Sequence, residues 1–455
     1  MTVQLPPVAV PLDRASAVAW YQRNRARSRA IFDLLDPSAY YSRPIALRNP
    51  IVFYEGHLPA FSVIAFLRRG LGRPPIDERL ETLFARGIDP DSVDAAVPRS
   101  GASTLWPSRD EVLAFARKCD DAIVDAVEHE PELPQEGLFT ALEHEAMHQE
   151  TLLYMWHRLP YEQKHKPDGR WAMLDRPRPA QPAAIRASIR IPAAEVTLGA
   201  DRAAVVFGWD NEFEAHRLDV PAFEIDALPV TNADYLEFVN AGGYRQRELW
   251  GDEGREWLQA EQVAYPAFWL PTDPSSIVHR PSNQSSIDHR PSNAWLWRGM
   301  FAQVPLPLDA PVYVSHAEAS AFARWKGRRL MTESEFQRAA YGSPSGADAA
   351  TDAPAGFYDF AGFDPVAAGS FPPSPFGVYD LIGNGWEWTS TVFAPFDGFT
   401  PMASYPEYSA DFFDGMHYVM KGASPVTPRE LVRPSFRNWF RGNYPYVYAK
   451  FRTVK

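Results

Sequence analysis

The sequence predicts a two-domain α+β protein, in which an N-terminal helical bundle is followed by a loop-rich α+β domain. The chain has 455 residues, more than one hydrophobic core usually holds, and its 45% hydrophobic residues can fill two cores. Up to about residue 158, apolar residues recur three and four positions apart, as in amphipathic helices. After about residue 190, short apolar stretches alternate with Gly, Pro, Asn and aromatic residues, which favours short strands and long loops.

Four segments of the N-terminal part have the helical pattern and are bounded by Pro, Gly or Asp: residues 14–35, 53–72, 109–130 and 136–159. Four such helices predict a bundle over residues 1–158. Residues 159–190 are rich in proline and lack periodicity, so we expect a linker there. In the second domain, residues 191–455, a convincing helical pattern occurs at 231–242 and 315–327.

Charge and cysteine content limit the function. A formal net charge of -12 and a pI near 5.5 argue against a general nucleic-acid or anionic-membrane surface, because binding there needs a basic face. The single cysteine, Cys119, excludes an internal disulfide framework and any multi-cysteine metal site. The first residues lack a signal-peptide pattern, and we see no run of about 18 apolar residues. We expect a soluble cytoplasmic protein that acts on small molecules, without nucleic-acid or membrane partners.

A tandem repeat, SSIVHRPSNQ followed by SSIDHRPSNA, occupies residues 275–294. Two histidines ten residues apart could suggest a metal site. A duplicated polar loop with one proline per copy is far more often an inserted turn. We therefore assign His279 and His289 no role.

The stretch HEAMHQE, residues 144–150, contains the His-Glu-x-x-His spacing of zinc proteases. On a helix, His144 and His148 lie about 40 degrees apart on one face, which Ala141 and Met155 share and which should point into the bundle. Two imidazoles in a core carry a desolvation penalty unless they are neutral and bonded, so the pattern favours a metal site over ordinary packing. Glu150 projects about 120 degrees from His144 and is a poor third ligand.

The continuation does not match an extended zinc protease, because the x-x-Gly-x-x-His sequence that should follow is missing. A third ligand could come from a facing helix, where His57 lies among apolar residues. Three nitrogen ligands leave half of an octahedral ion open, which suits iron that binds dioxygen and a substrate, but spacing alone does not separate Fe from Zn.

A series of motifs resembles the ergothioneine-pathway sulfoxide synthases (EgtB) and their selenoneine-forming relatives (SenA). The motifs are GHLPAF, HEAMHQETLLYMWH, FGWDNEFEAHRLDVPAFEIDALPVTNADYLEFVNAGGY, RWKGRRLMTESEFQRAA, GVYDLIGNGWEWTST and RPSFRNWF, and together they cover nearly the whole chain. The resemblance implies a DinB-like four-helix bundle and a C-type-lectin-like domain of the formylglycine-generating-enzyme kind. It also implies an Fe(II) site whose ligands are His57, His144 and His148.

The substrate that the resemblance implies is hercynine, the trimethylated betaine of histidine, whose cation calls for aromatic faces. The family pattern implies a catalytic tyrosine at Tyr405, a substrate-facing one at Tyr408, and residues that hold the betaine at Asn438 and Trp439. Without the family, any one aromatic residue here would be an ordinary packing residue. Trp386, Glu387 and Trp388 look like a core signature and stay outside the predicted site.

Two departures from the family concern the chalcogen donor. Where the synthases that use γ-glutamylcysteine carry an Asp that grips the donor's ammonium group, this chain has Phe440, and where they carry Gln between the ligating histidines it has Met147. No adjacent tyrosine pair of the cysteine-using relatives occurs near residues 80–95. A neutral selenosugar needs no ammonium partner, so we favour a selenoneine synthase over the alternative, an ergothioneine enzyme that uses cysteine or γ-glutamylcysteine. The arginine that meets the donor, Arg86 or Arg99, stays open.

The resemblance implies O2-dependent bond formation between selenium or sulfur and C2 of the hercynine imidazole, with oxygenation of the chalcogen and with Tyr405 as the proton or electron donor. We expect the pocket between the two domains. Two rivals remain. A zinc hydrolase would need Glu145 as its base, whereas the oxygenase makes Glu145 a replaceable surface residue. A non-catalytic binding protein would tolerate loss of the histidines.

Overall fold

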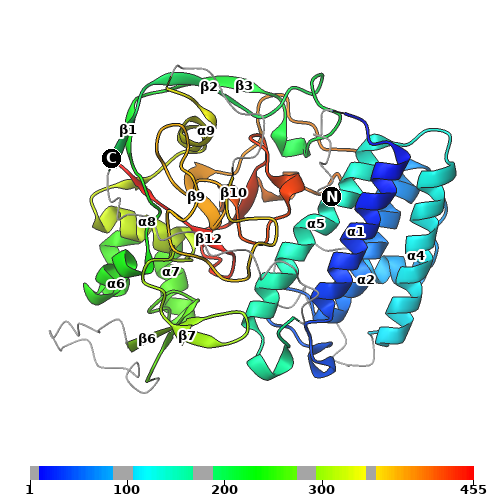
Figure 1. Ribbon diagram of the computed structural model, residues 1–455, viewed down its shortest axis with the longest axis horizontal. Coiled ribbons are helices and arrows are strands. Elements are labelled where there is room, and N and C mark those ends of the chain that lie inside the picture. Colours follow the sequence, from blue (N-terminus) through cyan, green and yellow to red (C-terminus); the bar gives the residue numbers. More distant parts are fainter. Residues whose placement is uncertain (1–9, 86–105, 168–187, 274–293, 345–354) are drawn as a thin grey trace. The chain divides into compact units, whose positions relative to one another are not determined.

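The computed structural model describes residues 10–85, 106–167, 188–273, 294–344 and 355–455 (Figure 1). The chain divides into two compact units. The first comprises Met1–Arg170, Ala200–Phe213 and Phe399–Ala410, and the second comprises Trp171–Gly199, Glu214–Gly398 and Asp411–Lys455. The predicted linker, residues 159–190, lies for the most part outside the described residues.

The first unit is a helical bundle. Its long helices are α1 (Arg14–Phe32), α2 (Ile51–Ser62), α4 (Arg109–His129) and α5 (Gln135–Arg158). Both α1 and α2 pack against α4 and α5, which gives the predicted four-helix arrangement (Figure 1). The side chains of Asp13 and Ser108 accept hydrogen bonds from backbone N–H groups in the first turns of α1 and α4, which explains where these helices begin.

Two features of the bundle did not follow from periodicity. A short helix, α3 (Glu78–Phe84), lies between α2 and α4 in the sequence, and α2 continues as a π-helix, η2 (Val63–Gly70). A Cβ at Gly137 of α5 would lie 2.8 Å from the carbonyl oxygen of Ala65, so glycine is what allows α5 to approach η2 so closely.

The segment Ile51–Gly70 is long and apolar enough to span a membrane by length and composition, with a mean hydropathy of 1.2. The segment is not an unbroken apolar run, since it contains Glu55, His57, Arg68 and Arg69. In the structure 89% of its most apolar 18-residue window is buried inside the protein, as in the central helix of a bundle. Such a helix packs against other helices on every side, so its sequence loses the polar face that marks a surface helix.

Two later segments of the chain fold with the helices, which the sequence did not predict. In Ala200–Phe213, the Trp209 indole donates a hydrogen bond of 2.8 Å to Glu143 of α5. In Phe399–Ala410, the Ser404 hydroxyl is hydrogen-bonded to Thr140 of α5 at 2.8 Å. Both bonds are buried, so each segment is fixed to α5 by a polar contact shielded from water. The predicted domain boundary therefore misses these two insertions.

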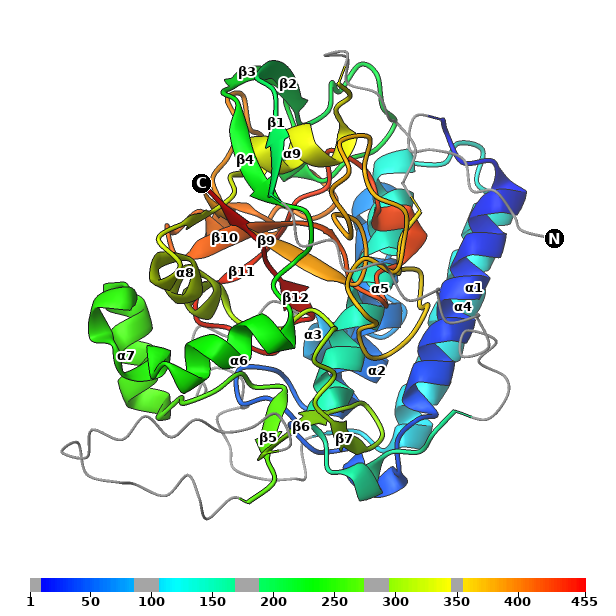
Figure 2. The same cartoon turned by 60° about the vertical axis from the view of Figure 1, so that its left-hand side comes forward.

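The second unit is an α+β domain, and its described residues form four sheets (Figures 1 and 2). One has the strand order β1 (Ser188–Ile191), β4 (Phe223–Asp226), β13 (Thr453–Val454), β8 (Arg329–Leu330). Another has the order β11 (Asn438–Arg441), β10 (His417–Ala423), β9 (Gly385–Val392), β12 (Ala449–Lys450). The smaller sheets are β2 (Ala194–Leu198) with β3 (His216–Val220), and β5 (Trp269–Pro271), β6 (Trp295–Arg298) and β7 (Gln303–Pro305).

The second unit contains the two predicted helices as α6 (Asn232–Asn240) and α8 (His316–Trp325). The sequence analysis missed α7 (Asp252–Glu261) and α9 (Glu333–Tyr341). Thr332 and Glu335 form a capping box at the start of α9, a signal that was present in the sequence. Helix length does not explain the omission, because α6 and α8 are also nine and ten residues long.

The expected core role of Trp386, Glu387 and Trp388 agrees with their burial on β9, where each is at most 2% exposed. The Glu387 carboxylate is paired with the ammonium group of Lys450 and the guanidinium group of Arg452, both at 2.9 Å. The two cations compensate the buried Glu387 carboxylate, which would be very costly there without a partner. It is part of the scaffold of the second unit.

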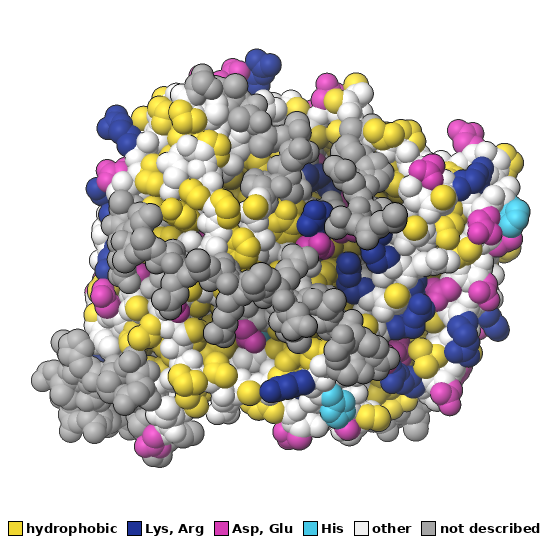
Figure 3. Space-filling model, in the orientation of Figure 1, with side chains coloured by type: hydrophobic (Ala, Val, Ile, Leu, Met, Phe, Trp, Pro, Cys, Tyr) yellow, Lys and Arg dark blue, Asp and Glu magenta, His cyan; other side chains and the backbone are white. Residues whose placement is uncertain are grey.

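On the face in Figure 3, Lys and Arg side chains lie interspersed with Asp and Glu side chains. The described residues of this face therefore form no extended basic patch, in keeping with the acidic composition.

Candidate active site

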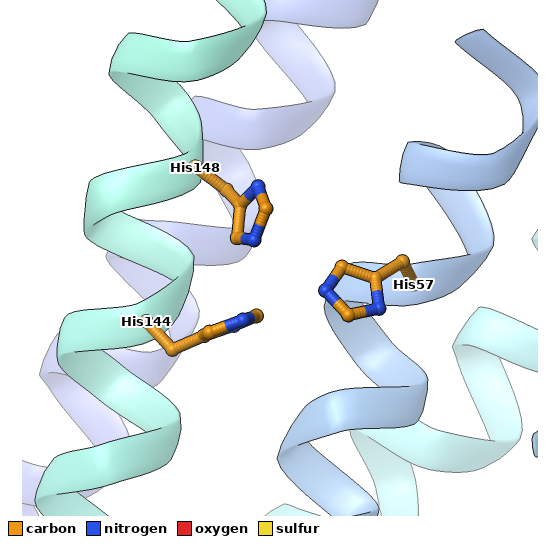
Figure 4. A group of neighbouring side chains, drawn as sticks. All are labelled: His57, His144 and His148. Carbon is orange, nitrogen blue, oxygen red and sulfur yellow. The ribbon is translucent and has the colours of Figure 1, made fainter. Parts of the chain in front are cut away.

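Three histidines from two helices meet inside the bundle. His57 comes from α2, and His144 and His148 come from one face of α5 because they are one turn apart. One ring nitrogen from each of the three can be chosen so that all lie within 4.8 Å of one another. Figure 4 shows the rings of His144 and His148 projecting from α5 towards His57. The geometry thus brings together the three residues that the sequence singled out as metal ligands.

The orientation of His57 is fixed by a backbone carbonyl. Its Nδ1 lies 2.7 Å from the carbonyl oxygen of Phe84, the last residue of α3. A carbonyl can only accept, so Nδ1 carries the proton and Nε2 is the nitrogen available to a ligand. The carbonyl is free because the last carbonyls of a helix have no partner within it. A Cβ at Gly56 would lie 2.4 Å from the Phe84 ring, so Gly56 leaves the space that Phe84 occupies.

All three imidazoles are neutral at physiological pH. Burial lowers the pKa of His57 to about 4. It lowers the pKa values of His144 and His148 well below the ordinary range, and the neighbouring histidines lower them further. A neutral imidazole is the form that binds a metal ion.

The donor set fits a divalent transition metal. The buried nitrogens His57 Nε2, His144 Nδ1 and His148 Nδ1 make no hydrogen bond within the described part of the chain. Unsatisfied buried nitrogens are costly in a plain core, and an ion that takes one nitrogen from each ring would offset much of that cost. Imidazole ligands suit Fe, Zn, Cu and Ni alike, so the ligand type alone does not choose the metal.

Aromatic rings surround the cluster. The Phe61 ring is stacked on His144, with centroids 3.5 Å apart and planes 12° apart. Tyr405 meets Phe61 edge-on at 4.8 Å, and its ring centroid is 5.9 Å from that of His144. Tyr405 is 9% exposed and belongs to the same compact unit as the histidines. Tyr405 and Tyr408 lie within the predicted domain 191–455 in the sequence, and in the structure they group with the helices of the first unit.

Tyr408 and Met147, two predicted substrate-binding residues, contact each other. The Tyr408 hydroxyl donates a hydrogen bond of 3.4 Å to the sulfur of Met147. Its ring packs on Trp209, with centroids 4.0 Å apart. Burial raises the pKa of Tyr408 well above its ordinary value, and nearby carboxylates, Asp210 first, raise it further. The phenol therefore stays protonated and acts as a donor.

Glu145 is not the surface residue that the oxygenase hypothesis led us to expect. Its side chain is 1% exposed, and its Oε1 accepts hydrogen bonds from Arg25 at 2.9 Å and from Ser28 at 2.6 Å. Arg25 also donates to Asp120 at 2.8 Å. The expectation was wrong because it assumed that a residue off the histidine face of α5, such as Glu145, points to solvent. In the structure α5 packs against other helices on more than one side.

Asn438, Trp439 and Phe440 lie on β11, in the second unit. The Trp439 ring is stacked on Phe393 at 4.3 Å with planes 4° apart, and Phe412 is 5.8 Å from it. These three rings form an aromatic group within the second unit. Phe440 is stacked on Tyr444, with centroids 5.3 Å apart. All four residues of β11 are partly exposed.

Sequence reasoning missed Phe61, the carbonyl of Phe84 and Trp209. Phe61 follows His57 by four residues, so the helical spacing could have revealed it. The other two depend on tertiary packing. His279 and His289, which were assigned no role, lie outside the described residues, as do Arg86 and Arg99, whose contact with the donor stays a prediction.

Residues 175–455 match the sulfatase-modifying factor enzyme 1-like domain, the FGE-sulfatase family. The chain is 30% identical to the hercynine oxygenase of Mycolicibacterium thermoresistibile over 92% of this chain and 89% of the relative. It is 34% identical to the hercynine oxygenase of Mycobacterium tuberculosis over 57% of each chain. It is 28% identical to ergothioneine biosynthesis protein 1 of Neurospora crassa over 93% of this chain, which spans about half (55%) of that relative. The chain is therefore an oxidoreductase of the hercynine oxygenase (EgtB) family with an FGE-sulfatase domain.

Proposed function

We propose that this protein is an Fe(II)- and O2-dependent oxygenase that forms a carbon–chalcogen bond at C2 of the hercynine imidazole and oxygenates the chalcogen. The observation that carries the proposal is the cluster of three neutral imidazoles with Tyr405 beside it, in a chain that is similar to hercynine oxygenases along most of its length. The names of those relatives support hercynine as the substrate.

His57, His144 and His148 would hold the metal through one nitrogen each. Fe(II) bound there would supply activation of O2 and coordination positions that the protein leaves open. The protein contributes a site that is buried, since His57 is fully buried and His144 is 3% exposed. Burial excludes water and strengthens electrostatic interactions within the site.

Tyr405 would deliver a proton. Its ring is held edge-on against Phe61, so the phenol is fixed beside the histidines. A fixed donor transfers its proton more effectively than one that must first be oriented. Tyr408 would line the substrate side together with Met147.

Trp439 and Asn438 would bind the betaine. A quaternary ammonium group cannot donate an N–H hydrogen bond, so its recognition depends on aromatic faces. The Trp439 ring is held by Phe393 against one face, which fixes its plane for such a contact. Asn438 accepts a hydrogen bond from the backbone N–H of Trp439 at 2.9 Å through Oδ1, so the amide orientation is set as well.

For the chalcogen donor, we propose a selenosugar, with cysteine or γ-glutamylcysteine as the alternative. The supporting observation is Phe440, which contributes an aromatic ring stacked on Tyr444 where the thiol-using synthases carry a carboxylate. An aromatic platform can pack against a sugar, whereas an ammonium group placed against Phe440 would meet no carboxylate from this position.

The test measures O2 consumption and product mass with hercynine and each donor. The chelated protein should regain turnover with Fe(II) and not with Zn(II), and turnover should require both hercynine and a donor. In competition at equal concentration, selenoglucose should be used in preference to γ-glutamylcysteine. Phe440→Asp should shift the preference towards the amino-acid thiols by about ten-fold, and Phe440→Leu is the matched uncharged control.

The possible results separate the proposals. Preference of the unmodified protein for γ-glutamylcysteine would reject the selenosugar and leave the ergothioneine alternative. Hydrolytic activity restored by Zn(II) would reject the oxygenase altogether. Unchanged turnover after removal of the histidines would reject any metal-dependent mechanism and favour a role for the histidines in packing alone.

A further inference from the structure

The three histidines are not held in the same way. His57 is fixed by its 2.7 Å hydrogen bond to the Phe84 carbonyl. The Nδ1 atoms of His144 and His148 are buried and make no hydrogen bond to the described residues. Rotation of a histidine ring about its Cβ–Cγ bond (χ2) costs little energy. An imidazole without a hydrogen bond therefore needs another contact to hold its ring in one orientation.

For His144 that contact is Phe61. The two rings lie face to face, with centroids 3.5 Å apart and planes 12° apart. Both side chains are 3% exposed, so neither ring can turn into solvent. The two rings are already at van der Waals distance, so a tilt of the His144 ring would push some of its atoms into the Phe61 ring. Phe61 lies one turn after His57 on α2, so it projects from the same face of the helix.

The same phenyl ring also contacts Tyr405, edge-on at 4.8 Å and 66°. Its centroid is 5.8 Å from that of His57. Phe61 thus contacts the ring of one proposed ligand and the ring of the proposed proton donor, and all of these residues belong to the first compact unit.

We infer that Phe61 is a positioning residue, which fixes the plane of the His144 imidazole and, through its edge contact, the place of Tyr405. The inference rests on the metal site proposed above. Phe61 offers no ligand atom and takes no part in proton transfer. Its effect is expected through His144 and Tyr405, so it should alter the coordination of the metal as well as the outcome of the reaction.

The chain offers a matched control in Phe53. This residue lies one turn before His57 on α2, is 3% exposed, and is stacked on the ring of His57 with centroids 5.0 Å apart and planes 18° apart. The carbonyl that holds His57 belongs to the backbone of Phe84, so Phe53→Leu should leave this hydrogen bond in place although the rings of Phe53 and Phe84 contact each other, with centroids 6.2 Å apart. Phe53→Leu and Phe61→Leu therefore each remove a phenyl ring from α2. Only Phe61→Leu removes the contact that holds His144, a proposed ligand that lacks a hydrogen bond.

The experiment uses the full-length protein and Co(II), whose visible absorption reports coordination geometry, with affinity measured against a competing chelator. Phe61→Leu should weaken Co(II) binding about ten-fold or more and change the visible spectrum. Phe53→Leu should retain the spectrum and stay within about three-fold of the unmodified protein. Phe61→Tyr keeps the flat ring and should restore both the spectrum and the affinity.

A second readout addresses Tyr405. With Fe(II), Phe61→Leu should divert product towards simple oxidation of the donor, as expected of Tyr405→Phe, whereas Tyr405→Phe should leave Co(II) affinity unchanged. Equal spectra and affinities for the two leucine variants would overturn the inference, as would a changed spectrum in Phe61→Tyr. If the unmodified protein binds neither Co(II) nor Fe(II), the proposed function fails instead. If Phe61→Leu does not fold, Phe61→Met takes its place with the same expectations. Methionine fills much of the space of phenylalanine but has no planar ring.

Discussion

The hydroxyl of Tyr408 donates a hydrogen bond to the sulfur of Met147 across 3.4 Å. The two residues lie far apart in the sequence, and each had been assigned to the substrate site for a separate reason. A thioether is a weak acceptor, so this bond should hold the phenol only lightly.

The first prediction tests that pair. Tyr408→Phe and Met147→Leu should each lower the free energy of unfolding by no more than about 1 kcal/mol, because the Tyr408 ring keeps its packing on Trp209. Urea unfolding of the double variant should reveal a coupling energy of about 0.5 kcal/mol or more. Strict additivity of the two single effects would mean that the contact carries no energy.

The second prediction concerns the metal ligands. His57→Ala, His144→Ala and His148→Ala should each lower metal affinity by about 100-fold or more, since two remaining nitrogens make a weak site. Metal content after dialysis measures this. His129→Ala on α4 is the control, because that side chain is 70% exposed and outside the cluster. Normal metal content in one of the three variants would remove that residue from the ligand set.

The third prediction concerns Tyr405→Phe. The ring and its contacts with Phe61 and His144 remain, so hercynine binding and metal content should be unchanged. The transferable proton is lost, so product formation should fall or divert to oxidation of the donor. Product analysis by mass decides, and an unchanged rate and product would exclude the proton-donor role.

Much of this site was predictable from local sequence, and the remainder was not. The spacing of His144 and His148 places them on one helical face, and the apolar surroundings of His57 point to the same interior. What holds His57, however, is a backbone carbonyl at the end of α3, and a carbonyl has no sequence signature. The burial of Glu145 could not be predicted from local sequence either. It depends on Arg25 of α1, a distant residue in the sequence, which donates a hydrogen bond to it.

Domain organisation shows the same division. The long helices of the bundle and the short helices α6 and α8 were predicted from their patterns, whereas α7 and α9, which have the same lengths as α8 and α6, were missed. The return of Phe399–Ala410 to the helical unit depends on pairwise contacts such as Thr140 with Ser404, which a single sequence does not reveal.

The fourth prediction concerns pH. Burial lowers the pKa of His316 to about 3, and a hydrogen bond that the imidazole donates to the backbone of Thr389 opposes this shift in part. The unfolded chain takes up this proton near pH 6.5. The stability contributed by neutral His316 is therefore complete above pH 6.5 and is lost as the pH falls from there towards 3, by roughly 5 kcal/mol in total.

His316→Phe keeps the stack on Tyr418, whose centroid is 3.6 Å away, and removes the titrating group. Urea unfolding between pH 7 and pH 4 should then take up about one proton fewer than in the unmodified protein. The exposed His129→Phe serves for comparison. A pH dependence identical to that of the unmodified protein would show that His316 is not buried in its neutral form.

The fifth prediction concerns the pair of Glu145 and Arg25. Glu145→Ala leaves the guanidinium group of Arg25 in the bundle with only Asp120 as its described carboxylate partner, so unfolding should become easier by about 3 kcal/mol or more. Replacing both residues together, Arg25→Met with Glu145→Leu, should cost less than the single change. Thermal and urea unfolding test this order. A fully stable Glu145→Ala variant that has lost only activity would instead favour the hydrolase.

The membership of Phe399–Ala410 in the helical unit has a consequence for the newly made chain. Ribosomes add about 5 to 20 residues per second, so Tyr405 is made roughly 10 to 50 seconds after His148. Throughout that interval the nascent protein possesses all three histidines but not the tyrosine. Any metal taken up in that interval would lie in a site that still lacks the residue proposed to govern its chemistry.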